Sequence, residues 1–95
     1  MLENTRYSIR DEIEQIGARV EYIDEATGEV KHKYKVGTKE FFSGSEYPVR
    51  VNRLTPEDDF VIQFPDYPFG VHASDYMDVI KFIVSFRGYY LRNKS

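Results

Sequence analysis

The sequence predicts an α+β fold, in which a short N-terminal helix, an antiparallel sheet of four to five strands and a long C-terminal helix form one domain over residues 1–95. Three observations carry this prediction. Hydrophobic residues recur at helical spacing near both ends of the chain, and they alternate with polar residues in the middle. The links between the alternating segments are of hairpin length, which favours antiparallel pairing, and we expect both helices to cover one face of the sheet.

The first predicted element is an amphipathic helix from Ser8 to Ile16. Ile9, Ile13 and Ile16 lie at i, i+4 and i+7 and therefore form one apolar stripe. Ser8 is suited to the N-cap position. Gly17 can adopt the left-handed conformation that ends a helix, so the helix is expected to end there.

A β-hairpin follows, because residues 18–23 and 30–36 both alternate between apolar and polar side chains. Residues 24–29 form the loop, in which Gly28 can adopt a positive φ. Residues 37–42 are expected to form either a short further strand or a bent connection. The sequence pattern leaves both alternatives open.

Two more strands and a helix complete the fold. Residues 47–54 and 60–64 alternate as strands, and residues 55–58 resemble a capped helical turn. A helix is expected from about residue 75 to 91, with Ser74 as its N-cap. Its apolar stripe consists of Tyr76, Val79, Ile80, Ile83, Phe86 and Tyr90.

Between the last strand and this helix lies an aromatic segment, Phe64–Asp75, which is the most informative part of the chain. Its two prolines and its glycine predict a loop outside regular structure. Tyr67 and Phe69 must then either cap the core or contact a partner. Burial is favoured for Phe69, whereas the hydroxyl of Tyr67 suits either environment. Exposed aromatic residues of this kind are typical of protein interfaces.

Composition excludes several classes of protein. A hydrophobic content of 41% is too high for a disordered chain. The absence of cysteine excludes disulfides, thiolate metal sites and cysteine nucleophiles. The first residues are polar, without the apolar core of a secretory signal, and no apolar run is long enough to cross a bilayer. A cytoplasmic protein is expected.

The sequence indicates no catalytic residue, no metal site and no cofactor. His32 and His72 are the only histidines, and they lack the close spacing of metal ligands. We expect His32 to be a hydrogen-bonded core residue and His72 to cap the final helix. No serine lies in a nucleophile elbow, and no glycine-rich loop joins a strand to a helix. An enzyme is therefore not expected.

Basic side chains alternate along the second strand of the hairpin, and such a strip is able to follow the phosphates of a single-stranded nucleic acid. Single-strand binders also need aromatic rings on the same face. Tyr22 and Tyr34 are expected on the core side of the sheet, which favours a solvated face instead. The candidate residues for this alternative are Arg19, Lys31, Lys33, Lys35 and Arg50.

Acidic residues gather in the expected loops, and the net charge is -3. Carboxylates at loop tips can imitate a row of phosphates and occupy the basic channel of a nucleic-acid enzyme. Solubility alone explains any single one of them. The acidic candidates are Asp24, Glu25, Glu29, Glu57, Asp58, Asp59 and Asp66.

Small size, an acidic balance and the lack of cysteine make the chain resemble, in general character only, the proteins that phages and mobile elements encode to block host enzymes, anti-CRISPR proteins among them. The resemblance implies a non-enzymatic protein-binding inhibitor or modulator that blocks a nucleic-acid enzyme by occlusion or acidic mimicry. The alternative is a module that binds single-stranded nucleic acid. A monomer and a homodimer both remain open. The predicted partner-binding residues are Asp24, Glu25, Glu57, Asp58, Asp59, Asp66, Tyr67 and Phe69.

Overall fold

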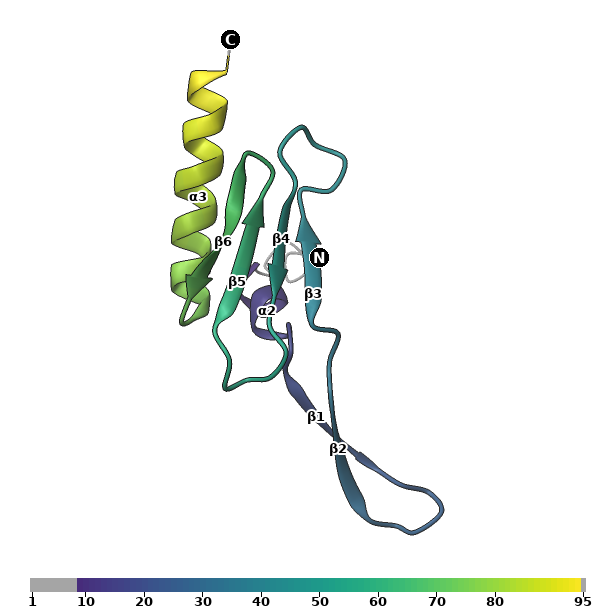
Figure 1. The fold of residues 1–95 in the computed structure, drawn as a ribbon. Helices are drawn as coiled ribbons and strands as arrows, with labels where there is room; N and C mark the ends of the chain where they lie inside the picture. The colour runs from purple at the N-terminus through teal and green to yellow at the C-terminus, as the bar shows by residue number, and fades with distance from the viewer. Residues whose placement is uncertain (1–8, 95) are drawn as a thin grey trace, which may run out of the picture.

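A computed structural model describes residues 9–94 and confirms the α+β class, with a short helix near the N-terminus and a long C-terminal helix (Figure 1). Its strands form two antiparallel sheets instead of the single predicted sheet. The smaller contains β1 and β2, and the larger has the order β3-β4-β5-β6. The elements are α2 (Ile9–Glu14), β1 (Arg19–Ile23), β2 (Val30–Tyr34), β3 (Thr38–Phe41), β4 (Val49–Asn52), β5 (Phe60–Phe64), β6 (Tyr67–Ala73) and α3 (Tyr76–Asn93).

The hydrophobic core lies between one face of the larger sheet and the two helices. Buried and accessible residues alternate along β4 and β5, as the predicted strand pattern requires. Arg50 and Gln63 are register partners on the opposite face, where both are exposed as predicted. The buried core residues are Ile13, Ile16, Phe41, Tyr47, Val49, Val51, Phe60, Ile62, Phe64, Ala73, Val79 and Ile83.

The predicted first helix is α2, and the proposed cap Ser8 lies outside the described residues. Helix α2 ends at Glu14, two residues before the predicted end at Ile16, and a turn follows in which Gly17 has the predicted left-handed conformation, with a φ of 70°. The terminal carbonyls of this segment are satisfied by a distant side chain. The guanidinium of Arg53 donates from Nε to the carbonyl oxygen of Ile16 at 2.8 Å and from Nη2 to that of Glu14 at 3.2 Å. Burial lowers the pKa of Arg53.

Strands β1 and β2 form a hairpin arm, which we define as residues 18–36, that projects away from the larger sheet (Figure 1). Every residue of β2 is exposed. The tip is ordered by local bonds, since the Gly28 amide donates to the Asp24 carbonyl at 2.6 Å and the Lys31 ammonium lies 2.7 Å from the Asp24 carboxylate. The hydrogen bond from Lys31 is the main cause of the lowered pKa of Asp24.

The expectation that the hairpin contributes an inner face to the core is therefore wrong. Alternation shows that two strands pair, but it does not show that their apolar side reaches other elements. The arm meets the body at a tight crossing: a Cβ on Gly17 would lie 2.3 Å from the carbonyl oxygen of Arg53, and one on Gly37 would lie 3.1 Å from it. At Gly17 only glycine permits this close approach, whereas a side chain at Gly37 would make a tight contact with the same carbonyl.

The aromatic segment also differs from the prediction, because most of it forms strand β6 instead of a loop. Strand β6 pairs with β5, with Phe64 opposite Tyr67 and Phe60 opposite Ala73. The register shifts between Ile62 and Phe64, as in a β-bulge. Pro68 is tolerated because β6 is the last strand of the sheet, where an amide donor is not required on the outer side.

Helix α3 is confirmed and runs through Gly88 to Asn93. Its N-cap is Asp75, whose carboxylate accepts from the Asp78 amide at 3.0 Å, one residue later than predicted. Residues 55–58 form a turn without a helix. The segment 37–42 contains strand β3, the first of the two alternatives.

Candidate functional site

Four aromatic side chains from β6 and α3 gather at the surface into what we call the aromatic patch: Tyr67, Phe69, Phe86 and Tyr89. Tyr67 is 42%, Phe69 68% and Tyr89 64% exposed. The ring of Tyr67 lies edge-on to Phe69 at 5.7 Å and to Phe86 at 5.6 Å between centroids. The prediction that Phe69 is buried is wrong.

The patch follows from the local sequence. The bulge opposite Gln63 occupies the Pro68–Gly70 part of β6, which turns the ring of Phe69 away from the core. Phe86 connects the patch to the core, because its ring stacks on the buried Phe64 at 4.2 Å between centroids with an interplanar angle of 8°.

Beside these rings is a shallow hollow of about 360 Å³, and its lining is mostly apolar. Asp66, Ser85 and Tyr89 supply polar groups at its margin. Asp66 is held in place, since its carboxylate accepts a hydrogen bond of 2.5 Å from the hydroxyl of Tyr47. The hollow therefore combines exposed rings with a fixed carboxylate, an arrangement suited to holding an apolar side chain of another protein.

Two members of the patch, Phe86 and Tyr89, are absent from the predicted partner-binding residues. A signal for Tyr89 exists in the sequence. It lies outside the apolar stripe that packs α3 onto the core, and a ring outside such a stripe must face solvent or a partner. The spacing of Phe82, Phe86 and Tyr89, at i, i+4 and i+7, places them along one flank of the helix.

The structure separates the predicted acidic residues into three groups. Asp24 and Glu25 lie at the tip of the arm, and Glu57, Asp58 and Asp59 lie in the link before β5. Asp66 lies in the turn after β5, so it is at the opposite end of that strand from Asp59. Asp58 also accepts a hydrogen bond of 3.0 Å from the hydroxyl of Thr55. Within residues 9–94, the three groups lie on separate segments of the fold and form no continuous row of carboxylates.

The basic residues are also divided between surfaces. In the arm, Tyr22 is the register partner of Lys31, and Val20 is the partner of Lys33. Because directly opposed residues of an antiparallel pair point to the same face, Tyr22 lies on the lysine side, and its expected position opposite the lysines is wrong. Arg19 pairs with Tyr34 on the other face of the arm.

Arg50 belongs to the larger sheet, where it pairs with Glu40 and Gln63. It therefore does not continue the row formed by Lys31, Lys33 and Lys35, which stands on a separate sheet. The cause is the division of the strands into two sheets, which the alternating pattern does not reveal.

Neither histidine has the surroundings that the sequence predicts. His32 is exposed on the arm, with Nε2 3.5 Å from a carboxylate oxygen of Glu21, and it does not lie in the core. His72 lies in β6, with Nδ1 4.0 Å from a carboxylate oxygen of Asp59, and it does not cap α3. Among residues 9–94, no three histidine, aspartate or glutamate side chains converge in a way that could hold a metal ion.

No helix in the described part of the chain has the length and apolar character needed to span a bilayer. Comparison with known proteins finds no matching family model, no matching curated protein and no matching solved structure.

Proposed function

We propose that this protein is a non-enzymatic protein-binding module that inhibits or modulates its partner by occlusion, with the aromatic patch as its anchor. The observation that supports this function is the aromatic patch: Tyr67, Phe86 and Tyr89 line one hollow, and Phe69 lies edge-on to Tyr67 beside it. Tyr67, Phe69 and Tyr89 are about two fifths to two thirds exposed. Contiguous exposed apolar surface of this kind typically marks an interaction site in a soluble domain.

The position of the patch adds to this argument. Strand β6 is an edge of the larger sheet, so a partner can contact its backbone and its side chains together. The ring of Tyr67 already lies against Phe86, which stacks on Phe64, and this reduces the entropy that Tyr67 loses when a partner binds. Tyrosine and tryptophan are enriched among the few residues that dominate binding energy, and such residues lie near the centre of an interface.

Between the two modes of inhibition, the geometry favours occlusion over acidic mimicry. Mimicry of a nucleic acid needs carboxylates in a row, whereas Asp24, Asp59 and Asp66 lie at three separate places. We keep two further parts of the proposal: the partner is a nucleic-acid enzyme, and the protein originates in a phage or mobile element, as anti-CRISPR proteins do. Both parts rest on the small size, the acidic balance and the lack of cysteine.

A double substitution tests the proposal. We expect the variant with Phe69→Ser and Tyr89→Ser to lose its partner, because each ring fits a hot-spot position and truncation of one hot spot weakens binding about 30-fold or more. The measurement is capture from bacterial lysate with tagged wild-type and variant proteins, followed by titration of the retained protein.

The chain offers a closely matched control on the same helix. Met77 is 63% and Val84 64% exposed, almost the same as Phe69 and Tyr89. Met77→Ser with Val84→Ser removes two similarly exposed apolar side chains from a different side of α3, and we expect this variant to retain the partner. Equal loss in both double variants, or undiminished capture by the Phe69 and Tyr89 variant, would contradict a role for the patch.

A further inference from the structure

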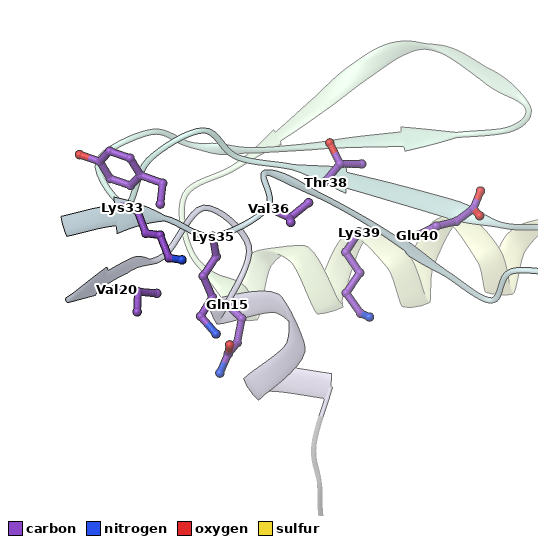
Figure 2. A pocket seen from close by; sticks show the side chains of 9 residues that line it. Gln15, Val20, Lys33, Lys35, Val36, Thr38, Lys39 and Glu40 are labelled. Atoms are coloured by element: carbon purple, nitrogen blue, oxygen red, sulfur yellow. The ribbon is translucent and has the colours of Figure 1, made fainter. Parts of the chain in front are cut away.

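A second surface, independent of the aromatic patch, lies where the arm joins the body. Lys33 and Lys35 from the arm and Lys39 from β3 line an open hollow of about 770 Å³, together with Gln15 after α2 (Figure 2). In Figure 2 the three lysine side chains extend toward the side on which Gln15 lies. We define the lysine surface as Tyr22, Lys31, Lys33, Lys35 and Lys39.

The lysines of this surface differ in whether a nearby carboxylate already neutralises their charge. Lys31 is paired with Asp24 at 2.7 Å, and Lys39 lies 3.5 Å from a carboxylate oxygen of Glu12. These ion pairs are partly exposed, so each contributes little stability and can exchange for another anion. Among the described residues, neither Lys33 nor Lys35 lies within ion-pair distance of a carboxylate. One acidic residue, Glu40, also lines the hollow.

An aromatic ring accompanies these cations. Tyr22 is 42% exposed on the same face of the arm, and the Lys33 ammonium lies 5.5 Å from the centroid of its ring. Alternate lysines on a strand recur roughly every 6.6 Å, so the charges form a regular line. A line of cations beside an accessible ring is the arrangement that binds single strands, where phosphates meet lysines and a base stacks on the ring.

We infer that the lysine surface binds single-stranded nucleic acid through its phosphates, with Tyr22 as a stacking platform. Other polyanions can pair with the lysines, but they have no base that could stack on Tyr22. The exposed ring therefore favours a nucleic acid over other polyanions as the ligand. A duplex keeps its bases stacked inside, so it would use the lysines and leave the ring without a partner.

Fluorescence anisotropy with a labelled 20-nucleotide oligothymidylate at low salt tests this inference. The wild-type protein should bind, with an affinity that falls steeply as salt increases. Replacing Lys33, Lys35 and Lys39 by glutamine should reduce the slope of log affinity against log salt by about 2, because each phosphate that a lysine no longer neutralises lowers the slope by about 0.7. Tyr22→Leu should weaken binding by about 5-fold or more.

The matched control replaces Arg19, Arg50 and Lys81 by glutamine. It removes the same charge from three exposed positions on other surfaces. This variant should keep the wild-type slope, and thermal melting should show that both triple variants remain folded. Absence of binding at low salt, equal slopes in the two triple variants, or poly-glutamate binding as tight as oligothymidylate would each overturn the inference. None of these outcomes depends on the aromatic patch.

Discussion

Tyr47→Ala is expected to lower the free energy of unfolding by about 3–5 kcal/mol, the range seen when a large buried aromatic residue is truncated. Tyr47 is completely buried although it lies outside every helix and strand. Its ring stacks on Tyr90 at 4.6 Å and lies 6.3 Å from Phe64, so it joins α3 to the larger sheet. Urea denaturation followed by circular dichroism measures the loss.

Tyr47→Phe separates the ring from the hydroxyl. It retains the packing but removes the 2.5 Å hydrogen bond to Asp66, which should lower stability by about 1–2 kcal/mol. Because Asp66 lies beside the aromatic patch, this bond also fixes the turn next to the proposed interface. If Tyr47→Phe destabilised the protein as much as Tyr47→Ala, the ring packing would have no separate role and this description of the core would be incorrect.

The same residue predicts a dependence on pH. Burial raises the pKa of Tyr47, and the hydrogen bond to Asp66 raises it further. Since the pKa is raised in the folded state, the contribution of the phenol to stability is complete below the unfolded pKa of about 10 and is lost as the pH rises above it. The stability difference between wild type and Tyr47→Phe should therefore shrink between about pH 9 and pH 11. A constant difference over that range would contradict the burial of the hydroxyl.

Gly17→Ala is the second substitution with a large expected effect, roughly 3 kcal/mol or more. Gly17 has a φ of 70°, which disfavours any side chain, and its Cβ would lie 2.3 Å from the carbonyl oxygen of Arg53. That carbonyl is backbone and cannot move aside without displacing the crossing between arm and body. Thermal or urea unfolding measures the change.

Gly44→Ala is the control for this substitution. Gly44 has a φ of 88°, but a Cβ there meets nothing within 4 Å. It should lower stability by only about 1–2 kcal/mol, from the left-handed backbone alone. Equal losses at Gly17 and Gly44 would show that the crossing is loose and that the arm is not fixed in position.

The secondary structure is largely predictable because its signals are local. The spacing of Ile9, Ile13 and Ile16 indicates α2, and alternation indicates β1, β2, β4 and β5. Strand β6 is not predictable in this way, because Pro68 and Gly70 normally interrupt strands, and the edge position of β6 together with its bulge makes them acceptable. An edge is a property of the whole sheet, which no local pattern contains.

The faces of the arm depend on the pairing register of β1 and β2, which alternation alone does not determine. Ile23 pairs with Val30, so the link between them has an even number of residues and Tyr22 falls opposite Lys31. A link shorter or longer by one residue would place Tyr22 on the other face. The aromatic patch is only partly predictable for a related reason: Tyr67 and Phe69 are distinctive in sequence, whereas Tyr89 becomes their neighbour only when α3 packs beside β6.

Hydrogen–deuterium exchange with and without the captured partner tests the central proposal most directly, because it locates the interface without any substitution. The proposal predicts slower exchange at the backbone amides of β6 and in the part of α3 around Tyr89 when the partner is bound. Unchanged exchange in both of these segments, with protection elsewhere in the chain, would contradict it.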